Sequence, residues 1–123
     1  MKKTVSLWKY SGIILLATGI LHTIVAVLFE RESLWAILRE GLFDTVGDDL
    51  ARGRAFWFLF CGITFIFLGQ VLHHYIKKEQ KPAPLFLGYY MLVLSIVGCI
   101  IIPASGFLLI LPQALIIILA KRK

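Results

Sequence analysis

Apolar residues are concentrated in four long runs separated by shorter polar segments. The runs cover residues 10–29, 55–76, 84–102 and 107–120. An α-helix needs about 20 mainly apolar residues to cross the hydrocarbon core of a bilayer. The pattern therefore predicts an all-α fold, an integral membrane antiparallel four-helix bundle that forms a single transmembrane domain over residues 1–123.

The fourth run is shorter than the other three. At a rise of 1.5 Å per residue its 14 residues span about 21 Å, which is less than the roughly 30 Å of the core. We expect this segment to lie with little tilt, or its ends to dip into the bilayer. The turn at residues 103–106 precedes it.

The longest polar segment, residues 30–54, contains a pattern of its own. Apolar residues recur at helical spacing in Leu34, Trp35, Leu38 and Leu42. This spacing predicts a short amphipathic helix over residues 33–43 in the first outer loop, either lying on the membrane surface or acting as a lid.

Composition supports a membrane protein. Hydrophobic residues make up 59% of the chain and charged residues 16%. Soluble domains average roughly 45–50% apolar and about 25% charged residues. These values disfavour both a soluble globular domain and a disordered chain.

The positions of the basic residues predict the orientation. Of the 13 Lys and Arg residues, nine flank the apolar runs at the N-terminus, in the 77–83 loop and at the C-terminus. The 30–54 loop holds the other four together with six acids. The positive-inside rule then places both termini in the cytoplasm. The net charge of +6 is interpreted as contact with the lipid bilayer, and no nucleic acid is expected as a partner.

Small residues recur seven positions apart within the runs. The pairs are Gly12 and Gly19, Gly62 and Gly69, and Gly88 and Ser95. Seven residues make nearly two helical turns, so the members of a pair share a face, and small residues let helices approach closely in lipid. We expect the first two runs to pack antiparallel through these stripes. The same stripes could instead form the contact of a homodimer.

A few polar or small residues lie at one depth in the predicted membrane. His22 is about 18 Å from the inner edge, counted at 1.5 Å per residue. Cys61, Ser95 and Gln113 fall near the same level. His22 and Gln113 either hydrogen-bond to hold the helices together, or they line a cavity that binds a ligand, with Pro112 opening the helix.

A second cluster lies at the outer end of the second run. Arg54 and Trp57 are predicted to guard the entrance of the pocket for an anionic or polar headgroup, beside an aromatic wall of Phe56, Phe58 and Phe60. The alternative is that these are charges and an interfacial Trp that extend toward the membrane surface.

Several stretches resemble a family of small four-span bacterial membrane proteins that is known only as a domain of unknown function. The stretches are residues 8–12, 19–22, 54–58, 103–107 and 112–114. More loosely, the chain is similar to DoxX-like membrane proteins. The resemblance implies a bacterial plasma-membrane protein and supplies no activity.

The leading hypothesis is therefore a membrane protein that binds a lipophilic or amphipathic small molecule in an outward-facing intramembrane pocket. The predicted ligand-binding residues are His22, Gln113, Arg54, Trp57, Cys61 and Ser95. Two alternatives stay open, a small transporter or channel acting as an oligomer, and an accessory subunit of a membrane complex. No cofactor, metal or catalytic residue is predicted, because the sequence has no catalytic or metal-binding motif.

Overall fold

The computed structural model describes residues 6–103 and 107–120, and this part of the chain is helical without a strand. The predicted all-α class is confirmed for it. The predicted turn residues 104–106 and the terminal basic residues Lys2, Lys3 and 121–123 lie outside the described residues. After a 3-10 turn, Leu7–Tyr10, the helices are α1 (Ser11–Phe29), α2 (Arg31–Arg39), α3 (Leu50–Glu79), α4 (Leu85–Ile101) and α5 (Phe107–Ile118).

Three of the helices follow the apolar runs closely, whereas α3 extends well beyond its run. It begins five residues before the predicted start at residue 55 and ends three residues after residue 76. Asp49 fixes the start, because its carboxylate accepts hydrogen bonds from the backbone N–H groups of Ala51 (3.0 Å) and Arg52 (3.1 Å). Gln80, with a left-handed φ of 54°, ends the helix.

The amphipathic helix of the outer loop is present but shifted. The helix α2 covers residues 31–39 rather than 33–43. Gly41 (φ 96°) and Leu42 (φ 73°) adopt backbone angles that an α-helix does not allow. Leu42 was predicted to lie in the helix because of its spacing, but it lies after the helix has ended.

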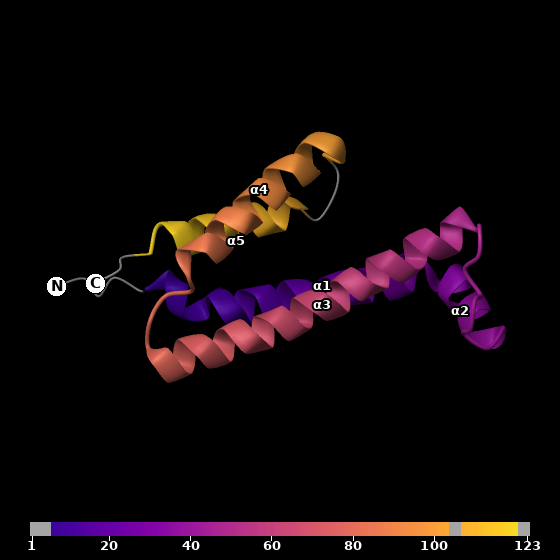
Figure 1. Ribbon diagram of the computed structural model, residues 1–123, viewed down its shortest axis with the longest axis horizontal. Coiled ribbons are helices and arrows are strands. Elements are labelled where there is room, and N and C mark those ends of the chain that lie inside the picture. The colour runs from indigo at the N-terminus through magenta and orange to yellow at the C-terminus, as the bar shows by residue number, and fades with distance from the viewer. Residues whose placement is uncertain (1–5, 104–106, 121–123) are drawn as a thin grey trace.

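The helices form two antiparallel hairpins of unequal length (Figure 1). The long hairpin pairs α1 with α3, and the short hairpin pairs α4 with α5. The short hairpin packs on the long one through α5, which contacts α1 and the 3-10 turn, whereas the backbones of α3 and α4 do not approach each other closely. The hairpins meet near the beginning of α1 and diverge toward the end of the molecule that carries α2.

Glycines set the close spacing within the long hairpin, as the sequence predicted. A Cβ atom added to Gly19 would lie 2.9 Å from the carbonyl oxygen of Gly62, and one added to Gly62 would lie 2.9 Å from the backbone nitrogen of Thr23. Gly12 and Gly69 face His73 and Leu16 equally closely. The backbones of α1 and α3 are therefore in near contact along both stripes.

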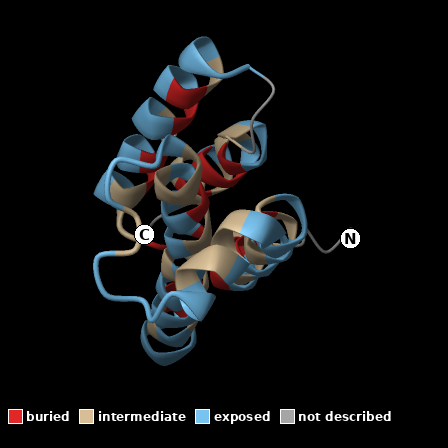
Figure 2. Cartoon of the chain, turned by 90° about the vertical axis from the view of Figure 1, so that its right-hand side faces the viewer, coloured by how far each residue is buried: buried red, intermediate tan, exposed pale blue. Residues whose placement is uncertain are grey.

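Buried residues lie on the faces that the helices turn toward one another (Figure 2). The core groups eight apolar residues where the two hairpins meet: Leu15, Leu72, Ile76, Ala83, Met91, Ile110, Ala114 and Ile117. The remaining apolar surface is largely exposed. Two segments, Leu7–Phe29 and Leu50–Glu79, are long and apolar enough to cross a membrane, and 22% of the most apolar window of each is buried. The helices α4 and α5 are apolar but shorter.

Candidate functional site

Gln113 joins the two hairpins. Its Nε2 donates hydrogen bonds to the hydroxyl oxygen of Thr18 on α1 (2.7 Å) and to the carbonyl oxygen of Leu109 one turn earlier on α5 (2.9 Å). The residue is 5% exposed. Its Oε1 is buried and has no hydrogen-bond partner among the described residues. Gln113 thus has a structural contact and one amide oxygen able to accept a further hydrogen bond.

His22 does not pair with Gln113. Its ring stacks on Phe58 of α3 with a centroid distance of 4.4 Å, and it meets Phe65 edge-on at 5.9 Å. His22 is partly buried within the long hairpin, one turn along α1 from Thr18. His22 and Gln113, which were predicted to lie at one depth, therefore contact different residues and do not bond to each other.

Cys61 and Ser95 form no hydrogen bond or ring contact with His22 or Gln113 within the described part of the chain. Cys61 is exposed on α3. Ser95 is fully buried on α4, the helix that packs on α5, and its hydroxyl donates to the carbonyl oxygen of Met91 one turn earlier. The bond satisfies the hydroxyl within its own helix. The structure does not bring Cys61 and Ser95 together with His22.

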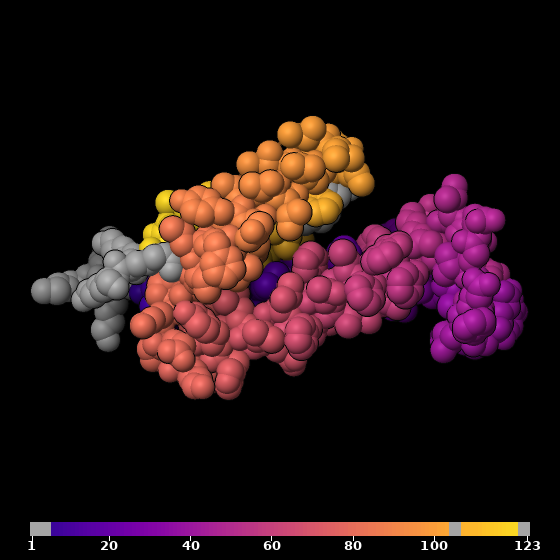
Figure 3. Space-filling model, in the orientation of Figure 1, coloured from indigo at the N-terminus to yellow at the C-terminus, as the bar shows by residue number. Residues whose placement is uncertain are grey.

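An apolar cleft, which the sequence did not predict, lies elsewhere in the molecule. It has a volume of about 340 Å³ and lies between the two hairpins, where Figure 3 shows a hollow between α3 and α4. Its walls come from four helices and from Pro84, with residues such as Leu15, Phe65, Leu94 and Ile110. Because the lining consists of ordinary apolar side chains from distant segments, no motif marks it. None of the six predicted ligand-binding residues lines it.

His22 is separated from the cleft by one side chain, because Phe65, which it contacts, lines the cleft. Gln113 lies three residues after another lining residue, Ile110, on α5. Its own hydrogen bonds go to Thr18 and Leu109, which do not line the cleft.

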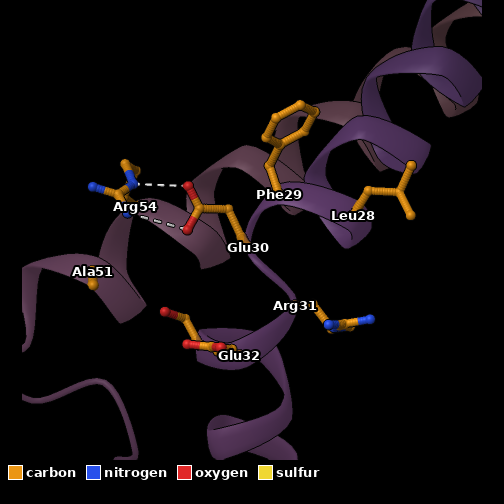
Figure 4. A pocket seen from close by; sticks show the side chains of 8 residues that line it. Leu28, Phe29, Glu30, Arg31, Glu32, Ala51 and Arg54 are labelled. Carbon is orange, nitrogen blue, oxygen red and sulfur yellow. Dashed lines mark hydrogen bonds and ion pairs between the residues drawn. The ribbon is translucent and has the colours of Figure 1, made fainter.

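Arg54 lies at the other end of the molecule, in a charged cavity. Its Nε donates to Glu30 Oε1 at 2.8 Å and its Nη2 donates to Oε2 at 3.2 Å (Figure 4). The Arg54 side chain is 65% exposed, so water screens the pair and its contribution to stability is small.

The charged cavity has a volume of about 360 Å³ and is formed where α1 ends, α2 begins and α3 begins. Two apolar residues, Leu28 and Phe29, flank the charged residues Glu30, Arg31, Glu32 and Arg54. Figure 4 shows these groups around the junction of α1 with α2. Apolar and charged side chains therefore lie next to each other along the edge of this cavity.

Trp57 lies outside this cavity and is 64% exposed. It meets Phe56 and Phe60 edge-on at 5.4 Å and 5.7 Å. Phe58, the third member of the predicted aromatic wall, faces α1 and His22 instead. Residues two apart on a helix point in nearly opposite directions, so Phe58 cannot share the face of Phe56 and Phe60.

Arg52 organises the connection between α2 and α3. Its Nη1 donates to Glu40 Oε2 (2.6 Å) and to the carbonyl oxygen of Thr45 (2.6 Å), and its Nη2 donates to Glu40 Oε1 (2.8 Å). This hydrogen bond lowers the pKa of the Glu40 carboxyl below its usual 4.5. The sequence shows Arg52 at this position, but it does not show that the side chain binds Glu40 and Thr45.

The two cavities differ in the side chains that line them. Within the described ranges, 6–103 and 107–120, no group of three His, Cys, Asp or Glu side chains could hold a metal ion. The two cavities instead offer one apolar cleft and one charged site with an apolar border.

Comparison with known proteins gives one match. The family of unknown function DUF6463 matches residues 6–123, which is nearly the whole chain. No curated protein matches the chain. No solved structure matches it either. The sequence had suggested an uncharacterised family, and the chain belongs to the family of unknown function DUF6463.

Proposed function

We propose that the protein is a bacterial plasma-membrane protein with four membrane-embedded helices that binds a lipophilic or amphipathic small molecule. The low burial of α1 and α3 supports the membrane setting. The central helix of a soluble protein is mostly buried, whereas 22% of the most apolar window of each of these helices is buried. Lipid is the solvent that such exposed apolar surface requires.

The observation that carries the binding proposal is the apolar cleft between the hairpins. Its volume of about 340 Å³ is within the range of small-molecule pockets, roughly 300–1,000 Å³. Because the side chains that line the cleft are apolar, it suits a hydrocarbon chain or a flat apolar ring system. Gln113 does not line the cleft, but its Oε1 is buried without a partner among the described residues, and a hydroxyl or amine of an amphipathic ligand that reached it would supply the missing hydrogen bond.

The cleft can be tested by filling it from either wall. Leu94 and Leu68 line the cleft and are 62% and 42% exposed, so each can become Trp without crowding the buried core. We expect Leu94→Trp and Leu68→Trp to reduce binding of the fluorescent apolar probe N-phenyl-1-naphthylamine to the full chain in maltoside micelles. The added indole occupies the space that the probe needs.

Neighbouring positions provide matched controls. Val93 and Phe67 lie on the same helices, are exposed and do not line the cleft. Val93→Trp and Phe67→Trp should bind the probe as the wild type does. Equal binding by all four variants would reject the cleft as the ligand site.

The roles of the two polar residues can be separated in the same assay. If His22→Ala and Gln113→Ala lower thermal stability but leave co-purified lipid and probe binding unchanged, both residues serve packing alone. A loss of binding of a hydroxylated probe such as a long-chain alcohol, with binding of the hydrocarbon probe retained, assigns Gln113 to the ligand.

A further inference from the structure

The apolar cleft follows the length of the helices that line it. On α3 the lining extends from Phe65 to Tyr75, which at 1.5 Å per residue is about 15 Å. On α4 it extends from Leu87 to Leu94, which is about 10 Å along that helix. The cleft is therefore elongated, and an extended hydrocarbon chain fits this shape better than a flat ring system.

The two ends of the cleft differ in polarity. Two tyrosines line it, Tyr75 four residues before the end of α3 and Tyr90 five residues after the start of α4. Both are therefore close to the connection between these helices, residues 80–84. Farther from the connection the lining is apolar, as at Phe65 and Leu94. A ligand with one polar end would lie with that end toward the connection, because a tyrosine hydroxyl can hydrogen-bond to it.

The segment between the lining residues Tyr75 and Pro84 is basic. All of its charged residues are exposed, and none of them forms an ion pair within the described ranges of the chain. Unpaired positive charge therefore lies next to the polar end of the cleft. The segment contains three lysines and one glutamate, a net charge of +2: Lys77, Lys78, Lys81 and Glu79.

The position of each charge around α3 decides which of them can serve the cleft. Lys78 follows Tyr75 by three residues and lies about 60° from it around the helix, whereas Lys77 follows by two and lies about 160° away. Glu79 follows Tyr75 by four residues and is on the cleft side as well. Lys81 is in the connection itself. Two lysines and one acid thus lie beside the cleft, and Lys77 lies on the other side of α3.

The cleft opens on its side. Several lining residues are exposed, among them Val71 on α3 and Tyr90 on α4, and Figure 3 shows the hollow between these helices. In the proposed membrane this face contacts lipid, so a ligand would enter from the surrounding leaflet rather than from water. The positive-inside rule places the end of the cleft near Lys78 in the cytoplasmic leaflet.

We propose that the cleft holds one acyl chain of an anionic phospholipid of the cytoplasmic leaflet, with the phosphate beside Lys78 and Lys81. The inference rests on the proposed function, because it names the ligand of the same cleft. Basic groups between membrane helices on the cytoplasmic side bind anionic headgroups in this way. The second acyl chain stays in the surrounding lipid.

The test measures which lipid the protein retains. The purified full chain is released for native mass spectrometry from maltoside micelles that contain equimolar dilauroyl phosphatidylglycerol and dilauroyl phosphatidylcholine. We expect phosphatidylglycerol to be retained about tenfold more than phosphatidylcholine, because two exposed lysines attract its net negative charge. Added salt should reduce this ratio, since it screens exposed charges.

Variants assign the ratio to single residues. Replacing both Lys78 and Lys81 by Gln should bring the retention of the two lipids to about the same level. Lys77→Gln, an exposed lysine on the other side of α3, is the matched control and should keep the ratio. Glu79→Gln should raise the ratio, because it removes a negative charge beside the headgroup. Leu94→Trp should lower the retention of both lipids, whereas Val93→Trp should not.

Four results would overturn the proposal. They are equal retention of the two lipids by the wild type, a ratio that survives the loss of Lys78 and Lys81, a ratio that Lys77→Gln lowers as much, and full retention by Leu94→Trp. Stronger retention of laurate than of phosphatidylglycerol would reject a phospholipid as the source of the chain. Binding of N-phenyl-1-naphthylamine that depends on Leu94, without a preference for phosphatidylglycerol, would reject this assignment and leave the proposed function in place.

Discussion

At the scale of single residues, the glycines of α1 and α3 carry the clearest structural information. Four of them, Gly12, Gly19, Gly62 and Gly69, lie where the two backbones approach so closely that a Cβ would meet main-chain atoms of the other helix. The spacing of seven placed each pair of glycines on one helix face, and the structure shows that these faces pack against each other within the long hairpin.

Gly62→Ala should destabilise the long hairpin. The new Cβ would lie 2.9 Å from the nitrogen and 3.1 Å from the Cα of Thr23, and backbone atoms cannot rotate away as a side chain can. Overpacking of this kind costs about 1–3 kcal/mol, which thermal unfolding in micelles would detect. Gly53→Ala is the control, because its Cβ would meet only Val46 Cγ1 at 3.8 Å. Equal effects of the two variants would contradict close packing at Gly62.

The candidate site was harder to predict at this scale. Counting residues gives the depth of His22, Cys61, Ser95 and Gln113 but not the direction in which each side chain points around its helix. Depth alone could not show that His22 faces Phe58 or that Gln113 reaches Thr18. Those contacts depend on how the helices are rotated and paired.

At the scale of elements, helix existence was predictable and helix ends less so. The apolar runs gave α1, α4 and α5 to within two residues at each end. They underestimated α3, because an apolar run measures the apolar part of a helix, while Asp49 and Gln80 set its ends. The spacing of apolar residues in the outer loop misplaced α2, because Leu42 continues the helical spacing after the backbone has already turned at Gly41.

The connection between α2 and α3 should respond to acid through Glu40. Its folded-state pKa lies below 4.5, so the stabilisation is complete above that pH and is lost as the pH falls through the lowered value. We expect the connection to resist pepsin at pH 4.5 and to become cleavable at lower pH. Glu40→Gln removes the charge and should give cleavage with little dependence on pH across this range. A wild-type connection already open at pH 4.5 would argue against the ion pair with Arg52.

At the scale of the whole molecule, the helices of the two hairpins differ in length. At 1.5 Å per residue the 30 residues of α3 span about 45 Å, whereas the 17 of α4 and the 12 of α5 span about 25 Å and 18 Å. A hydrocarbon core of roughly 30 Å is longer than either helix of the short hairpin. The end of that hairpin should therefore lie below the far surface of the proposed membrane.

Cysteine labelling can measure this depth. With Cys61 and Cys99 replaced by Ser, Ile102→Cys should react poorly with a membrane-impermeant maleimide, because it is held within the bilayer. Asp48→Cys, in the exposed connection before α3, should react readily and serves as the control. Equal labelling at both positions would show that the short hairpin reaches the far surface.

The separation into two hairpins also bears on how the chain is made. The partners of α1 lie mainly on α3, and those of α4 lie mainly on α5, so each hairpin can form from a continuous stretch of chain. The first is fully synthesised before the second leaves the ribosome, and the segment between Gln80 and Pro84 is the joint between them. In the proposed membrane setting each hairpin would then insert as a unit and pack on the other afterwards, and the apolar cleft lies where the two units meet.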